Sequence, residues 1–419
     1  MAIISVGARS IYISGNDMQR QPRTGHLVSL KNLGGVERHF SRFLSSMLST
    51  GHDYHVLPMT TELHPIVQEE QEPNLERFHS IKGPWGISLP RQIPGLRKAY
   101  QKTLLKKLDL DQLVVWNKYT NMPLALPAEL PIVHFERGSA WFIDPTPEVQ
   151  RYLSRWSGVI CNSHASLRVL QLKLGLSVDC PALVARNAMA LPPAMATHDS
   201  SIFRLGFAGR LTALKAPVVA LEVIRLLREK CTNVQLHIAG DGPLRDPLEK
   251  MVKAWGLDEV VHFHGIVQDM SLFYRHLDAF ICPSWREPFG NVVQEALAHG
   301  VPAIVSNVDG LPEQVTHGHN GAVLPPERSI DTLGDYDSAF VGPKVCVYSP
   351  EQDAMVEAKV MSAESAAQIL REWMNDPTSR QAMGARARTT ILEHFDYPQY
   401  CASVGEFLDR LASERAQRA

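Results

Sequence analysis

Short β-branched or apolar runs alternate with helix-length segments along almost the whole chain, and they do so in two series. Strands that alternate with helices form parallel sheets covered by helices on both faces. The pattern therefore predicts an α/β fold with two doubly wound domains. The strands expected in the first series are Ile11–Ser14, Tyr54–Leu57, Leu113–Trp116, Ile132–Phe135, Gly158–Cys161 and Leu183–Ala185. Those expected in the second series are Leu205–Ala208, Val234–Ile238, Val260–His264, Ala279–Cys282 and Ala303–Val305.

The segment AMALPPAMATHDSS, residues 188–201, separates the two series. It is rich in Pro, Ala and small polar residues and has no clear periodicity, as is typical of a linker. A chain of 419 residues is also longer than one ordinary core requires. We therefore expect an N-terminal domain over 1–190 and a C-terminal domain over 202–395. The stretch at about 325–358 carries Pro, Gly and Asp without a pattern and is expected to be an inserted loop or small hairpin.

Composition excludes several classes of protein. The net charge of −2 argues against a protein that binds nucleic acid through global positive charge. No apolar run reaches the roughly 18 to 20 residues that span a bilayer. The six cysteines lie far apart without a CxxC pair, which fits reduced thiols in a cytoplasm. We therefore expect a cytoplasmic protein that at most touches a membrane surface.

The segment ICPSWREPFGNVVQEALAHGVPAIVSNVDGLPEQV, residues 281–315, is the most informative part of the chain. A strand runs into a Pro-containing loop, and a helix is predicted to begin near Gly290 and to end at Gly300. In open α/β sheets, ligands bind at this carboxyl edge, where free N–H groups at a helix start receive anions or hydroxyls. Glu287 lies in the loop, and Glu295 falls four residues after Asn291 on the same helix face.

Two such carboxylates could accept hydrogen bonds from the vicinal diols of a ribose or a hexose. The alternative is structural: Glu287 would cap the helix and Glu295 would only face solvent. Two further segments strengthen the ligand interpretation.

The segment GRLTALKAP, residues 209–217, places Arg210 and Lys215 in a loop between a strand and a helix. These cations suit a diphosphate, because Arg can fork across two oxygens and Lys is a compact point charge. In LGGVERHF, Gly34 and Gly35 precede a helix and would let a phosphate approach backbone N–H groups. The segment LHIAGDGPL is not a dinucleotide site, since Arg245 stands where the third glycine should be.

Together these segments resemble the motifs of the GT4-type retaining glycosyltransferases, which have the GT-B fold of two Rossmann-like domains facing a cleft. GGVERHF is similar to the family's N-terminal glycine loop, and GRLTALKAP to its phosphate-binding loop. EPFGNVVQEALAHGVPAI matches its Glu-x7-Glu segment, and IAGDGPL resembles a structural turn. The resemblance implies that the N-terminal domain binds the acceptor and the C-terminal domain the nucleotide-sugar. A last helix, within 396–419, would return to the N-terminal domain.

The resemblance also implies roles for individual residues. Glu295 would hold the ribose, Arg210 and Lys215 the diphosphate, and Glu287 the transferred sugar. Where the family has a His near the anomeric carbon, this chain has Arg137, whereas His134 is expected to be a core residue of its strand. The candidate catalytic residues are Glu287, Arg210, Lys215 and Arg137. The candidate donor-binding residues are Gly34, Gly35, Arg210, Lys215, Glu287, Phe289, Gly290, Asn291, Val292 and Glu295.

The chemistry implied is transfer of a sugar with retention, without a metal or other cofactor, from a UDP-, GDP- or ADP-sugar to a glycan or glycolipid of the cell envelope, such as a polysaccharide or lipopolysaccharide. Two alternatives stay open. A sugar-nucleotide epimerase can share the two-domain layout, and a binding protein can keep the fold without catalysis.

The segment 93–110 carries Arg97, Lys98, Lys102, Lys106 and Lys107 beside several leucines. A basic helix in an acceptor domain would suit an anionic glycolipid or a membrane surface. The alternative is a helix packed on the core with a solvated basic face.

Overall fold

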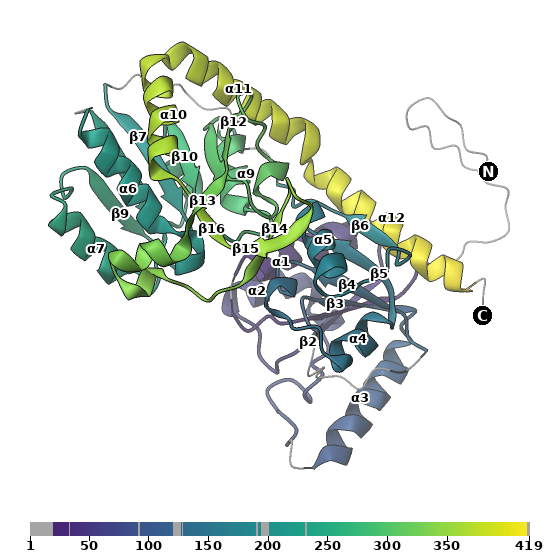
Figure 1. Cartoon of the computed structure of the whole chain (residues 1–419). Helices are drawn as coiled ribbons and strands as arrows, with labels where there is room; N and C mark the ends of the chain where they lie inside the picture. Colours follow the sequence, from purple (N-terminus) through teal and green to yellow (C-terminus); the bar gives the residue numbers. More distant parts are fainter. Residues whose placement is uncertain are drawn as a thin grey trace, which may run out of the picture.

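The computed structural model describes residues 20–32, 34–90, 93–119, 127, 129–189, 192–193, 201–230 and 233–416. Two lobes make up the described chain, and each holds one six-stranded parallel sheet (Figure 1). The α/β fold with two doubly wound domains is thus confirmed. The expected strand Ile11–Ser14 and most of the expected linker lie outside the described residues.

The N-terminal sheet has the strand order β2-β1-β3-β4-β5-β6. Its strands are β1 (Thr24–Val28), β2 (Tyr54–Pro58), β3 (Gln112–Trp116), β4 (Ile132–Glu136), β5 (Trp156–Cys161) and β6 (Ala182–Val184). The strands β1 and β3–β5 are almost wholly buried because α-helices cover both faces of the sheet. The helices of this domain are α1 (Gly35–Ser49), α2 (Pro65–Glu70), α3 (Pro94–Leu108), α4 (Pro147–Leu153) and α5 (His164–Leu172).

The C-terminal sheet has the order β12-β11-β10-β7-β8-β9, so the chain switches direction across the sheet between β7 and β10. Its strands are β7 (Phe203–Ala208), β8 (Val234–Ala239), β9 (Val261–Gly265), β10 (Ala279–Cys282), β11 (Ala303–Ser306) and β12 (Gly321–Leu324). Its helices are α6 (Pro217–Arg228), α7 (Arg245–Ala254), α8 (Met270–Tyr274), α9 (Asn291–Ala298), α10 (Ala363–Asn375) and α11 (Pro377–His394). The loops after neighbouring strands β7 and β10 open at the same edge, where doubly wound sheets bind ligands.

The expected insertion at 325–358 contains a β-hairpin. Strands β14 (Cys346–Ser349) and β15 (Ala354–Glu357) pair antiparallel, and β13 (Pro326–Ser329) pairs with β16 (Lys359–Met361) at the base of the excursion. In Figure 1, β14 and β15 lie between the two lobes, close to α5. The insertion therefore reaches from the C-terminal domain to the N-terminal domain.

The last helix, α12 (Tyr397–Ala416), leaves the C-terminal domain and runs along the N-terminal domain (Figure 1). Tyr400, Val404 and Leu408 are buried in the same core cluster as Phe43 of α1. The packing of α12 holds the end of the chain on the opposite lobe.

Two further observations concern the expectations from composition. Within the described residues, no helix is both long and apolar enough to cross a membrane. The five cysteines that the structure describes, all except Cys231, are unpaired.

Candidate functional site

The loop after β7 is shaped by close contact with the loop after β8. A Cβ on Gly240 would lie 1.9 Å from the carbonyl oxygen of Gly209, and one on Gly242 would lie 2.6 Å from that of Leu211. The N–H group of Leu211 donates to the carbonyl of Asp241 at 3.0 Å. IAGDGPL is therefore a structural turn, and its glycines let it support the backbone on both sides of Arg210.

Arg210 itself is exposed, and its side chain bonds to no residue that the structure describes. Lys215 lies at the end of a short 3-10 turn, Ala213–Lys215, that leads into α6. Its ammonium group forms an ion pair with the carboxylate of Glu287, from the loop after β10. The structure thus brings two of the predicted diphosphate and sugar residues into direct contact, although they are 72 positions apart.

The loop after β10 ends in a glycine that its conformation requires. Gly290 has φ +93°, and a Cβ there would lie 2.8 Å from a methyl carbon of Leu311. Phe289 is buried, so only its backbone is available to a ligand. The N–H group of Val293 bonds back to Gly290, which leaves those of Asn291 and Val292 at the open end of α9.

Glu295 lies one turn further along α9. Its carboxylate accepts a hydrogen bond of 2.9 Å from the hydroxyl of Tyr274. Burial raises the pKa of Glu295, partly offset by Tyr274 and by Arg42 and Arg38 of α1. These arginines lie on the N-terminal domain, so Glu295 faces the junction of the two domains.

The glycine pair of the N-terminal domain meets the start of α9. Gly34 caps α1, and its N–H group donates to the Glu37 carboxylate at 2.9 Å. A Cβ on Gly35 would lie 3.8 Å from the side-chain nitrogen of Asn291. The first residues of α1 and α9 therefore face each other across the domain junction, and Asn187 donates to Asn291 there at 2.6 Å.

Arg137 follows β4 and is buried. Its Nε and Nη1 atoms have no hydrogen-bond partner in the described part of the chain. Burial lowers the pKa of Arg137, and neighbouring Tyr400 of α12 partly offsets this. His134 is fully buried and stacks on Trp156 at 4.2 Å between ring centroids, which confirms it as a core residue.

Sequence reasoning missed three residues that organise this site. Asp309 accepts a 2.9 Å hydrogen bond from the Glu287 N–H group. Arg286 donates to the carbonyl of Gly138 in the N-terminal domain. Gln314 donates to the carbonyl of Gly290 at 3.3 Å. Only Asp309 had a local signal, an Asp-Gly pair after a strand, and that pair indicates a turn rather than a role.

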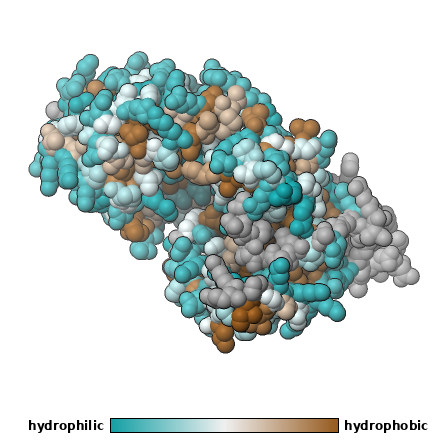
Figure 2. Space-filling view, turned by 60° about the horizontal axis from the view of Figure 1, so that its bottom comes forward, coloured by the Kyte–Doolittle hydropathy of each residue, from teal (hydrophilic) through white to brown (hydrophobic). Residues whose placement is uncertain are grey.

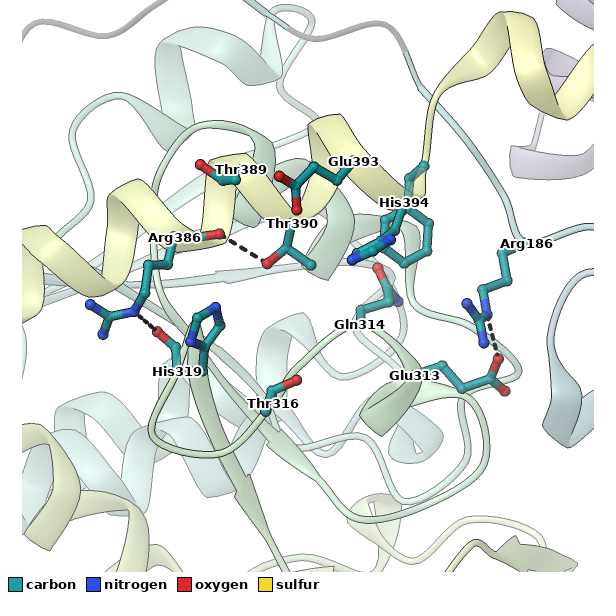
Figure 3. Close-up of a pocket in the computed structure, with 11 residues that line it drawn as sticks. Arg186, Glu313, Gln314, Thr316, His319, Arg386, Thr389, Thr390, Glu393 and His394 are labelled. Atoms are coloured by element: carbon teal, nitrogen blue, oxygen red, sulfur yellow. Dashed lines mark hydrogen bonds and ion pairs between the residues drawn. The ribbon is translucent and has the colours of Figure 1, made fainter.

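A cavity of about 420 Å³ lies beside this site, at the junction of the two domains. Figure 3 shows its polar lining, with α11 on one side and the loop that carries Gln314 and Thr316 on the other. At its rim, Arg186 pairs with Glu313 at 3.1 Å. Glu313 also accepts hydrogen bonds from two N–H groups at the start of α5, so the cavity borders a contact that joins the domains.

Known proteins are similar to this chain in sequence over part of its length and in fold over most of it. Residues 198–336 match the family described as glycosyl transferases group 1. D-inositol 3-phosphate glycosyltransferase from Arthrobacter sp. (strain FB24) is 32% identical over 34% of this chain and 35% of that protein. The chain therefore matches only about a third of the length of the first such relatives.

Solved structures match far more of the chain. A glycosyltransferase from Rickettsia africae ESF-5 superimposes with a TM-score of 0.70 at 15% identity, over 94% of this chain and 99% of that one. Anabaena Alr3699/HepE in complex with UDP gives 0.69 at 17% identity, over 93% and 100%. The fold is thus the GT-B fold, and residues 198–336 match the glycosyltransferase family that the resemblance predicted.

Proposed function

We propose that the protein transfers a sugar from a nucleotide-sugar to an acceptor, with retention of configuration and without a metal. The observation that carries the proposal is the Lys215–Glu287 pair, which lies at the carboxyl edge of the C-terminal sheet between exposed Arg210 and the open start of α9. Arg210 lies in the same loop as Lys215, and the free N–H groups at the start of α9 follow Glu287 in the loop after β10. A nucleoside diphosphate linked to a sugar presents the matching groups.

In this proposal, Arg210 and Lys215 stabilise the negative charge that grows on the diphosphate as the glycosidic bond breaks. The ion pair with Glu287 holds the Lys215 ammonium group close to the proposed diphosphate position, so the Lys215 side chain needs little reorganisation during the reaction. Glu287 in turn accepts hydrogen bonds from sugar hydroxyls, and Glu295 accepts them from the ribose. Arg137 is the candidate for the group nearest the anomeric carbon, because its guanidinium has two nitrogens without a partner in the described chain.

A donor screen tests the proposal. UDP-, GDP- and ADP-sugars are incubated with the protein, and nucleoside diphosphate release is measured with and without candidate acceptors. A glycosyltransferase releases the diphosphate faster when the acceptor is present. An epimerase converts the sugar without release, and a binding protein only binds the donor. HepE was crystallised with UDP, which makes UDP-sugars the first donors to try.

The acceptor is proposed to be an anionic envelope glycolipid or polysaccharide, met at the cytoplasmic face of a membrane. Lys102, Lys106 and Lys107 are exposed on α3, which projects from the N-terminal domain (Figure 1). Large apolar side chains are exposed beside its start, with Trp85 43%, Ile87 62%, Ile93 53% and Leu96 43% accessible. Figure 2 shows apolar side chains gathered at this end of the molecule. Basic and apolar groups side by side suit a headgroup region.

The leucines of this helix are divided between the core and the solvent in the structure. Leu105 and Leu108 point into the core, whereas Leu96 faces solvent. Replacing Lys102, Lys106 and Lys107 with Glu should therefore weaken binding to anionic vesicles without unfolding the domain. The matched control replaces the exposed Lys230, Lys250 and Lys253 of the C-terminal domain with Glu. Equal vesicle binding by both triple variants would exclude α3 as the membrane contact.

A further inference from the structure

Asp309 joins three segments that are far apart in the sequence. It follows β11 with φ +48°, and its side chain is buried. Its Oδ1 atom accepts hydrogen bonds from the indole N–H of Trp141 at 2.9 Å and from the backbone N–H of Tyr348 at 2.8 Å. Its Oδ2 atom accepts one from the backbone N–H of Glu287 at 2.9 Å. One carboxylate thus contacts the N-terminal domain, the inserted hairpin and the loop after β10, which carries Glu287 and is called the sugar loop below.

The peptide groups of Glu287 are held from both sides by this turn. Besides the bond to Asp309, the carbonyl of Glu287 accepts a hydrogen bond of 3.2 Å from the N–H group of Gly310. A Cβ on Gly310 would lie 2.1 Å from the carbonyl oxygen of Pro288, so the two loops touch directly. The position of Glu287 therefore depends on the turn at Asp309 and Gly310.

The inserted hairpin is fixed to the N-terminal domain. Tyr348 is buried in that domain's core cluster, and Met355 packs against the same cluster. Tyr348 donates through its hydroxyl to Asp353 at 2.9 Å, and Asp353 accepts two hydrogen bonds from Arg168 of α5, at 2.8 and 2.7 Å. Tyr348 of the hairpin therefore contacts both the core of the N-terminal domain and the carboxylate of Asp309.

A second residue of the sugar loop, Arg286, packs against the ring of Trp141. The guanidinium of Arg286 lies 4.9 Å from the centre of the Trp141 ring and 4.5 Å from that of Phe142. Because Arg286 directly precedes Glu287, the loop contacts Trp141 through both Arg286 and Asp309. Trp141 lies in the N-terminal domain, so its contacts with Arg286 and Asp309 require that the two domains lie together.

We propose that Asp309 is a positioning residue for Glu287. It places Glu287 for sugar binding only when the two domains lie together, so that Trp141 and Tyr348 of the hairpin both donate hydrogen bonds to Asp309. This inference rests on the proposed function. Separation of the domains would remove the Trp141 donor from a buried carboxylate, which is costly unless the turn rearranges. Closure of the domains and formation of the sugar site would therefore be one event.

Asp309→Asn tests the inference, because an amide must turn its NH₂ group toward one of three N–H donors. We expect turnover to fall on the order of 10- to 100-fold, as for a catalytic group displaced by about 1 Å. Affinity for the nucleoside diphosphate alone, measured by calorimetry, should stay within about threefold, because the proposed diphosphate ligands are Arg210 and Lys215, and neither bonds to Asp309. Trp141→Phe keeps the ring but removes the donor, and should lower turnover in the same direction. The two substitutions should be less than additive when combined.

NMR can detect the hydrogen bond between Trp141 and Asp309 without an activity assay. In protein labelled with ¹⁵N-tryptophan, the Trp141 indole signal is identified by its loss in Trp141→Phe. A hydrogen bond to a carboxylate should place this proton downfield, and Asp309→Asn should move it upfield. Lys344→Ala is the control, since Lys344 pairs with exposed Asp331 within the insertion, and should change neither turnover nor the indole signal.

Three results would overturn the inference: near-normal turnover in folded Asp309→Asn, an equal loss of turnover and of diphosphate affinity, or full additivity with Trp141→Phe. If Asp309→Asn fails to fold, Trp141→Phe alone decides, by whether turnover falls while diphosphate affinity holds. If the wild-type protein binds no nucleoside diphosphate at all, the proposed function fails instead, and the indole signal still reports whether Asp309 joins the domains.

Discussion

Lys215 and Glu287 form an ion pair between the loops that follow β7 and β10, at the point where the strand order of the C-terminal sheet reverses. Their side chains are only 28% and 11% exposed. Arg210 lies in the same loop as Lys215 but is exposed and bonds to nothing in the described chain through its side chain. Replacing Arg210 and replacing Lys215 should therefore have different effects on stability.

Arg210→Ala should separate function from stability. Because Arg210 has no partner in the described structure, its loss should change the free energy of unfolding by no more than about 0.5 kcal/mol. Loss of a cation that stabilises the leaving diphosphate should lower turnover on the order of 100-fold at saturating donor. Denaturant unfolding and steady-state kinetics on the same preparation check both numbers. Normal turnover would remove Arg210 from the diphosphate site.

Lys215→Ala should lower turnover and also destabilise the fold, because Glu287 would lose its cation in a mostly buried position. The double variant Lys215→Ala with Glu287→Gln should recover stability but not turnover. Thermal unfolding and kinetics of the single and double variants make this comparison. Recovery of turnover in the double variant would show that Lys215 serves only to balance Glu287.

Glu295→Ala should act mainly on binding. Ribose contacts change little during the reaction, so their loss weakens ground state and transition state alike and raises the donor KM more than it lowers kcat. Donor titrations against Arg210→Ala provide the contrast. A kcat loss as large as that of Arg210→Ala, with an unchanged KM, would be incompatible with a ribose role.

Gly310→Ala should displace the loop that carries Glu287, although Gly310 belongs to a different loop. The new Cβ would meet the Pro288 carbonyl at 2.1 Å, so a backbone shift is required. Overpacking of this kind costs about 1–3 kcal/mol of stability, and turnover should fall as Glu287 moves. Gly95→Ala on α3 is the matched control, because nothing lies within 4 Å of its added Cβ. Equal stability of the two variants would show that the loops can separate freely.

Stability should depend on pH through Asp309. Burial raises the pKa of Asp309 to about 6, although Arg286 and the three hydrogen-bond donors partly oppose this. The unfolded carboxyl titrates near pH 4, so between about pH 4 and pH 6 the folded state binds a proton that the unfolded state does not. The stabilisation is therefore present at low pH and is lost as pH rises through about 6.

Comparison with Asp309→Asn isolates this group, because other titrations cancel. The unfolding free energy of the wild type relative to the variant should fall by on the order of 2 kcal/mol from about pH 4 to about pH 7 and stay level above. Denaturant titrations at a series of pH values give the curve. A difference that does not vary with pH would mean that the carboxyl titrates alike in both states.

The parallel sheets could be predicted from the sequence because most of their strands are short β-branched or apolar runs. The strand β1 was missed, since its sequence TGHLV has a glycine and a histidine in the middle. It is a strand because it lies between β2 and β3, where burial on both faces outweighs local preference.

The site was predictable where its residues fall in one local segment, as Glu287 and Glu295 do. The contacts that organise it were not predictable. Asp309 and Trp141 are 168 residues apart, and no local pattern marks either side chain as the other's partner. Such long-range polar contacts are determined by how the two domains meet, which a single sequence does not encode in its periodicity.

Proton NMR of one reaction mixture tests whether the protein transfers a sugar with retention of configuration. The protein is incubated with the nucleotide-sugar that it binds and with an acceptor, and the anomeric signals are followed over time. We predict that nucleoside diphosphate accumulates while the transferred sugar keeps its anomeric configuration. Arg210→Ala should slow both changes, and Lys344→Ala should leave them as in the wild type. Inversion at the anomeric carbon, or conversion of the sugar while it remains attached to the nucleotide, would show that the protein is not a retaining glycosyltransferase.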